Sequence, residues 1–160
     1  MKLAELFTLQ LERETASTRR LLQNVPLENP DWKPHPKSTT LGYLSMLVAT
    51  MPGWIAMIVD REYLDLAEGP QPSQPKDLVA LFDKSVDSAR RALEKTSDEH
   101  LMQLWQLRVA GKVVEEKTRY ATIGDTFSHF AHHRGQLTVY LRLNEKPIPS
   151  IYGPTADEKW

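Results

Sequence analysis

The chain has 160 residues, of which 41% are hydrophobic and 26% charged, a composition typical of one soluble domain with one core. Its formal net charge of −1 at pH 7 gives no field that would attract nucleic acid or an anionic membrane. The absence of cysteine excludes disulfides, cysteine-ligated zinc and thiol nucleophiles. Charges interrupt the N-terminus and no apolar run is long enough to span a bilayer, so we expect a cytoplasmic protein.

Apolar residues at helical period predict a long first helix over residues 2–24. Its apolar stripe carries one carboxylate, Glu14, which is costly to bury unless it is paired or metal-bound. Pro26 follows the last apolar residue and ends the helix. The next helix begins near Thr40, a residue that can cap it, and Pro52 predicts a kink or a break within this segment.

Residues 68–75 contain three prolines and predict an extended surface linker within the domain. A third helix follows over residues 76–96, with its apolar side chains on one face. Ser97 is placed to cap a further short turn of helix. Residues 104–120 carry a weak extended pattern, and Gly111 within it indicates a small hairpin.

The last long helix is predicted from about Thr122 to Asn144, and three prolines make the tail after Lys146 irregular. Four long amphipathic segments indicate an all-α fold, a four-helix bundle formed by one domain over residues 1–160. A short helix or small hairpin precedes the last long helix. Bundle cores are frequent places for metal sites, because facing helices can each direct a ligand inward.

Three of the five histidines lie close together in the last long helix. His129 and His133 are four residues apart, which sets them about 40° apart on one helix face. Such a pair can bind Zn, Ni, Fe or Mn through neutral imidazole nitrogens. The alternative is two partly buried histidines bonded to backbone or to a carboxylate, and this spacing arises easily by chance. His132 points away from the pair.

Three segments of the sequence resemble a known family. They are His-Phe-Ala-His-His-Arg-Gly-Gln at 129–136, Thr-Leu-Gly-Tyr-Leu at 40–44 and Trp-Lys-Pro-His-Pro-Lys at 32–37, and the tail segment Pro-Ser-Ile-Tyr-Gly-Pro at 149–154 is reminiscent of one subgroup. Together they resemble the DinB/YfiT-like superfamily of four-helix bundles with a metal site. The resemblance implies three histidine ligands, of which two fall on His129 and His133. The position that matches the third, in the second helix, is Leu47, which cannot ligate a metal.

Three explanations of this departure remain open. Leu47 can simply extend the core, where burying a leucine contributes roughly 1.5–3 kcal/mol. Glu14 or Asp125 can replace the missing ligand, although a salt bridge from Glu14 to Arg134 or to a histidine is the simpler role for that acid. Two histidines and waters can also hold a metal weakly.

Two classes of function follow. The resemblance implies a divalent-metal-dependent transferase that activates a low-molecular-weight thiol such as bacillithiol against an electrophile, and it implies a homodimer. The alternative is a metal-free, non-catalytic bundle that binds a small molecule or a partner, which the leucine at position 47 favours. No catalytic residue can be named from the sequence. Trp105 is a candidate for a pocket wall, whereas His35 is most simply a surface residue.

Overall fold

Four helical segments form a bundle, as the sequence predicts. The structure, a computed structural model, describes residues 2–67 and 77–159, so the linker predicted at 68–75 lies outside the described residues. The segments of the bundle are α1 (Leu3–Gln23), α2 (Leu41–Thr50) with α3 (Pro52–Asp60), α4 (Leu78–Lys95) and α6 (Arg119–Leu143). Their apolar faces share one core, in which Leu21, Leu41, Phe82, Ile123 and Leu137 are almost completely buried.

The second segment is broken at Pro52, where α2 ends and α3 begins with a bend of 50°. Proline has no backbone N–H to continue the helix ladder, but it fits the first turn of a new helix. Near the start of α2, Gly42 leaves no room for a side chain, because an added Cβ there would lie 2.9 Å from the Cβ of Pro30. Within the described residues no single helix passes the length and hydropathy test for a membrane span; α2 and α3 pass it only when taken together as a bent pair.

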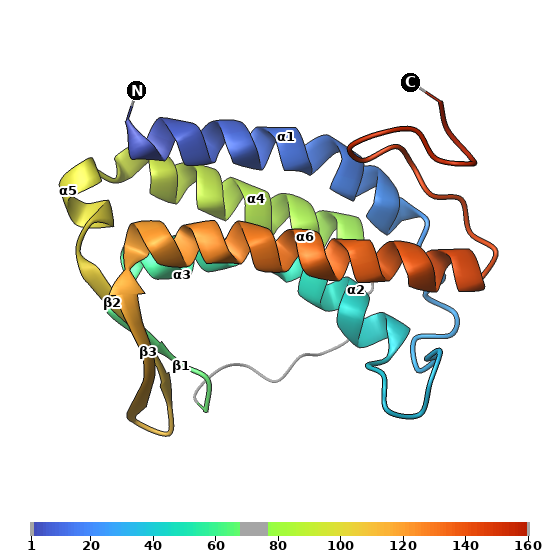
Figure 1. Ribbon diagram of the computed structural model, residues 1–160, viewed down its shortest axis with the longest axis horizontal. Coiled ribbons are helices and arrows are strands. Elements are labelled where there is room, and N and C mark those ends of the chain that lie inside the picture. Colours follow the sequence, from blue (N-terminus) through green and yellow to red (C-terminus); the bar gives the residue numbers. More distant parts are fainter. Residues whose placement is uncertain (1, 68–76, 160) are drawn as a thin grey trace.

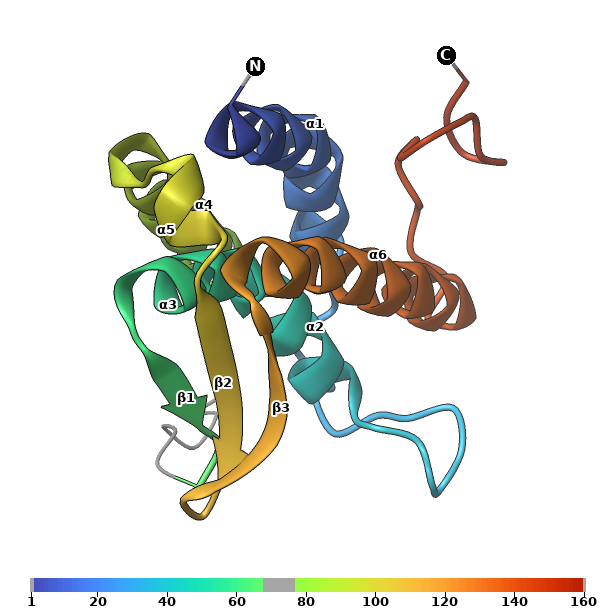
Figure 2. The same cartoon turned by 60° about the vertical axis from the view of Figure 1, so that its left-hand side comes forward.

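A three-stranded sheet makes the all-α prediction wrong in part. Its strands are β1 (Tyr63–Asp65), β2 (Leu104–Val109) and β3 (Lys112–Thr118), in the order β1-β2-β3, with β1 parallel and β3 antiparallel to β2. The sheet projects from one end of the bundle, beside α3 and the start of α6 (Figures 1 and 2). The predicted hairpin at Gly111 is β2–β3, and the short helix α5 (Asp98–Leu101) precedes it with Ser97 as its cap.

The tip of the hairpin is held by one buried carboxylate. Asp65, the last residue of β1, accepts backbone N–H bonds from Ala67, Ala110 and Gly111 at 2.6–3.0 Å. These bonds lower the pKa of Asp65. Gly111 has a φ of 78°, a conformation that glycine adopts without steric cost. A strand of three residues has too few positions to show an alternating pattern, which explains why β1 was not predicted.

The start of α6 is tied to the sheet and to α3 by one arginine. Arg119 is buried, and its guanidinium donates to the carbonyl oxygens of Ile58, Arg61 and Leu104. The bonds to Ile58 and Arg61 satisfy carbonyl groups at the end of α3 that have no partner within the helix, and the bond to Leu104 reaches the start of β2. The helix therefore begins three residues earlier than predicted, with Thr118 as its cap. Arg119 thus links the sheet to the bundle, and the site lies in the space between them.

Candidate functional site

The two histidines of α6 face each other from successive turns. Their Nε2 atoms are 2.8 Å apart and their ring centroids 4.6 Å apart. The Nδ1 of His133 lies 2.7 Å from Oε1 of Gln136, which assigns the ring proton of His133 to Nδ1. His133 Nε2 then accepts a hydrogen bond from His129 Nε2–H. The Nε2 atoms of the two rings thus point toward each other.

His129 lies at the surface and contacts Trp54 of α3, with ring centroids 5.6 Å apart. Partial desolvation lowers the pKa of His129, and repulsion from His133 and His132 lowers it further. Its imidazole therefore stays neutral to a lower pH than that of an ordinary histidine. A neutral imidazole can ligate a metal or accept a hydrogen bond from a ligand.

The position of the expected third ligand is aliphatic. Leu47 of α2 is half-buried and packs against the hydrophobic core, as the simplest of the three explanations predicts. In the part of the chain that the structure describes, no three His, Cys, Asp or Glu residues come together as a metal-ligand group. The three-histidine centre that the resemblance implies therefore does not fit the donors present at this site.

Glu14 is paired rather than placed beside the histidines. Its carboxylate lies 2.5 Å from the guanidinium of Arg134, which also donates to Thr18 Oγ1 at 2.7 Å. Both charged side chains are buried, and Tyr152 from the C-terminal tail donates its hydroxyl to Glu14 at 3.0 Å. Burial raises the pKa of Tyr152. The predicted salt bridge of Glu14 to Arg134 is present, whereas the contribution of Tyr152 was not predicted.

Asp125 is also engaged elsewhere. Its Oδ2 lies 2.5 Å from Nζ of Lys117 on β3, and the same ammonium lies 2.9 Å from Oε1 of Glu115. Asp125 stands one turn before His129 on α6, yet it forms no ligand group with the two histidines. It does share a different feature with His129, because both line the same cavity.

A cavity of about 430 Å³ lies between the inner face of the sheet, α3 and α6. Most of its surface is apolar, and seven apolar side chains supply it: Trp54, Met57, Ile58, Leu64, Leu66, Trp105 and Leu107. Among the described residues, five polar side chains also line it: Glu115, Thr122, Asp125, Thr126 and His129. Its volume lies within the range of cavities that bind small molecules in proteins.

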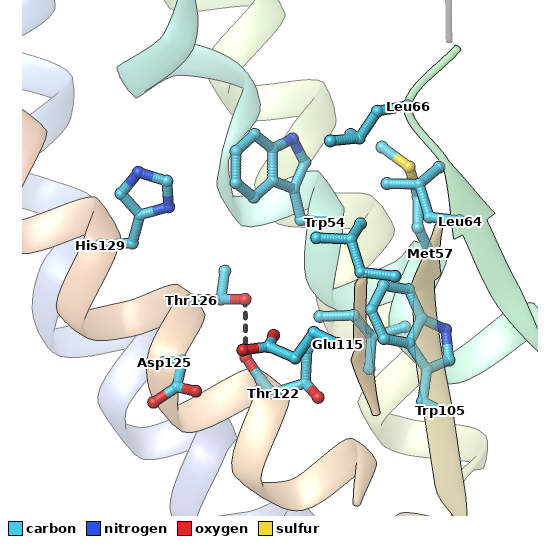
Figure 3. A pocket seen from close by; sticks show the side chains of 12 residues that line it. Trp54, Met57, Leu64, Leu66, Trp105, Glu115, Thr122, Asp125, Thr126 and His129 are labelled. Atoms are coloured by element: carbon cyan, nitrogen blue, oxygen red, sulfur yellow. Dashed lines mark hydrogen bonds between the residues drawn. The ribbon is translucent and has the colours of Figure 1, made fainter. Parts of the chain in front are cut away.

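The polar and apolar residues lie on different sides of this cavity. Figure 3 shows the polar side chains of α6 along one wall and Trp54, Met57 and Leu64 across from them. The alternation along β2 explains the other wall, since Trp105 and Leu107 are two residues apart and point to one face of the sheet. Trp105 therefore lines a pocket, as predicted. His35 is exposed in its loop, and its Nδ1 accepts from the backbone N–H of Lys37.

The cavity was not predicted as a whole, because half of its wall comes from the sheet. Leu64 and Leu66 follow α3 in a segment with no periodic pattern, and Glu115 lies in a strand whose side chains are mostly exposed. The sequence indicated only a weak extended pattern over residues 104–120 and Trp105 as a candidate for a pocket wall. The position of the cavity depends on how β1 and β2 pair, which no local pattern reveals.

The bundle with its broken second segment and terminal sheet defines a DinB-like fold. Similar solved structures include a DinB-like protein, YjoA, from Bacillus subtilis (TM-score 0.71, 18% identity, 91% of this chain and 97% of that chain). Another is a DinB-like protein from Bacillus cereus ATCC 10987 (TM-score 0.71, 22% identity, covering 92% of this chain and 97% of that chain). A third, from Exiguobacterium sibiricum 255-15, is described as a putative member of the DinB family (TM-score 0.69, 18% identity, covering 94% of this chain and 97% of that chain). The predicted DinB-like bundle is confirmed at the level of the fold.

The sequence comparison adds one relative. The chain is 25% identical over 155 residues to the uncharacterized protein YrdA of Bacillus subtilis (strain 168). The aligned region covers 96% of this chain and 90% of the relative. No protein-family model matches the chain. The comparisons therefore establish the fold.

Proposed function

We propose that this protein binds a small, largely apolar molecule in the cavity between the sheet, α3 and α6. The cavity itself carries the proposal, because a space of about 430 Å³ lined by two tryptophans can surround most of the surface of a small ligand. This function corresponds to the metal-free bundle predicted from Leu47. It requires only the cavity, and no third metal ligand.

The energetics favour an apolar occupant. Each Å² of apolar surface removed from water contributes roughly 25 cal/mol, so a ligand that covers the apolar wall gains several kcal/mol before any polar contact forms. Trp54 and Trp105 offer flat faces against which an aromatic ring can stack. His129 at the edge of the cavity provides a polar contact that can orient the ligand.

Calorimetric titration with a neutral aromatic probe, 1-naphthaleneethanol, tests this proposal. Leu66 lines the cavity and is 57% exposed, so Leu66→Trp should narrow the space without disturbing the core and weaken binding at least about tenfold, or about 1.4 kcal/mol. Leu104→Trp is the matched control, since Leu104 is 61% exposed and lies outside the lining. Equal affinities in the two variants, or no binding to the unmodified protein, would refute the proposed function.

A divalent transition metal bound by His129 and His133 is a second candidate, favoured by the orientation of the two rings. His133 donates Nδ1–H to Gln136, which is the arrangement that histidine ligands of metals commonly show, and directs Nε2 toward the Nε2 of its partner. Two imidazoles with waters in the remaining positions would hold the ion weakly. The thiol transferase activity that the resemblance implies would in addition need a ligand that Leu47 does not supply.

A further inference from the structure

The polar wall of the cavity consists of hydrogen-bond acceptors. Thr122 Oγ1 donates its proton to the carbonyl oxygen of Thr118, and Thr126 Oγ1 donates to that of Thr122 (dashed line in Figure 3). Each hydroxyl then has only lone pairs left to offer a ligand. His129, whose Nε2–H is directed to His133, likewise presents Nδ1 as an acceptor. Glu115 and Asp125 are carboxylates and accept only.

The same wall carries an excess of negative charge. Both carboxylates that line the cavity, Glu115 and Asp125, share the single ammonium of Lys117, which is not part of the lining. One positive charge between two negative ones leaves a net charge of −1. The guanidinium of Arg119 pairs with neither carboxylate; its N–H groups donate to the backbone carbonyls of Ile58, Arg61 and Leu104.

Among the described residues, the available hydrogen-bond donor of the lining stands apart from this wall. Figure 3 shows the indole nitrogen of Trp54 on the ring edge beside Leu66, away from Thr126 and Asp125. The indole nitrogen of Trp105 is fully buried and without a partner within the described residues, so a molecule in the cavity does not reach it. A ligand that matches this arrangement has an apolar body and a group that donates hydrogen bonds and carries positive charge.

We propose that the occupant of the cavity is an apolar amine, a molecule with an aromatic or aliphatic body and a protonated amino group. Its body lies against Trp54, Trp105 and the aliphatic residues, and its ammonium faces Glu115, Asp125 and the threonine hydroxyls. This inference rests on the proposed function and adds the chemical class of the ligand. An ammonium group has only donors, so it complements a wall that has only acceptors.

Three probes with the same ring system separate the two proposals: 2-(1-naphthyl)ethylamine, 1-naphthaleneethanol and 1-naphthaleneacetate. Measured by calorimetry at low salt, the amine should bind about five- to tenfold more tightly than the alcohol, and the carboxylate more weakly than either. The preference is modest because Glu115 and Asp125 are partly exposed, and it should shrink at about 0.5 M salt.

Glu115→Gln combined with Asp125→Asn should remove the preference, so that the ratio of the affinity for the amine to that for the alcohol falls to about one. Glu116→Gln is the matched control, because Glu116 is the next residue of β3, lies outside the lining and accepts a hydrogen bond from Gln106. Equal binding of amine and alcohol to the unmodified protein, or tighter binding of the carboxylate, would overturn this inference while the proposed function stands. If none of the three probes binds, both proposals are wrong.

Discussion

Two neighbouring residues of α6 show how differently its two sides are built. Arg134 is only 1% exposed, and its guanidinium is bonded to Glu14, Thr18 and Tyr152. His133 precedes it, is half-exposed, and faces His129 beside a cavity. On the side toward α1 the polar groups are paired with one another. On the side toward α3 and the sheet, acceptors face an open space.

This difference separates the architectural part of the molecule from the part that can bind a ligand. A buried charge that is fully paired has no capacity left for a ligand, and its role is to fix the position of helices. Acceptors that keep unused lone pairs at the wall of an apolar cavity have that capacity. The segment His-Phe-Ala-His-His-Arg-Gly-Gln thus contributes to both parts, with Arg134 directed to one side and His129 to the other.

The largest effect is expected on the side of α6 that faces α1, where the polar groups are paired. Arg134→Met leaves Glu14 as a buried carboxylate without its counterion, which should cost about 3–5 kcal/mol of unfolding free energy. Chemical denaturation measures this loss. Arg90→Met is the control, since Arg90 pairs with Glu12 on the surface at 2.6 Å and such pairs contribute at most about 1 kcal/mol. Equal losses in the two variants would show that the buried pair has no special role in stability.

A smaller effect, on metal affinity, is expected on the other side of α6, which carries His129 and His133. Leu47→His should raise the affinity for Zn²⁺, Ni²⁺ or Mn²⁺ at least about tenfold, or 1.4 kcal/mol, if residue 47 of α2 faces the imidazole pair. Titration calorimetry and elemental analysis of protein purified without a His tag give the comparison. His133→Ala should abolish metal binding, whereas His132→Ala should not.

Metal affinity that does not change in Leu47→His would mean that α2 and α6 do not converge at this position. Absence of metal from both the unmodified protein and Leu47→His after saturation would remove the two-histidine candidate. Neither result affects binding in the cavity, because Leu47 is not part of its lining.

The bundle could be predicted from the sequence because its signals are local. Periodic apolar residues and the break at Pro52 placed the helices to within a few residues, and Glu14 on an apolar stripe correctly indicated a buried ion pair. The sheet was predicted only as a hairpin at Gly111. Strand β1 pairs in parallel with a segment about forty residues further along the chain, and such pairing leaves no local pattern.

The candidate site was predictable only as far as it lies on one helix. The spacing of His129 and His133 indicated that their rings meet, and they do. The sequence did not show that Asp125 and Glu115 would share Lys117, because that contact joins α6 to β3. A cavity with walls from three elements depends on tertiary geometry, so neither its volume nor the excess of acceptors could be read from periodicity.

The smallest effect concerns the protonation of His129. Its pKa is lowered mainly by partial desolvation and further by His133 and His132, so NMR titration of the ring should give a midpoint below the ordinary value of 6.5. His133→Ala should raise this midpoint only in part, because desolvation by Trp54 and the helix remains. When the pH falls below the ordinary pKa of histidine, the unfolded chain takes up the proton before the folded protein does. The free energy of unfolding should therefore decline until the pH passes the lowered pKa of the folded state. A midpoint at or above the ordinary value would show that the ring faces bulk water, and the contrast between the two sides of α6 would not extend to His129.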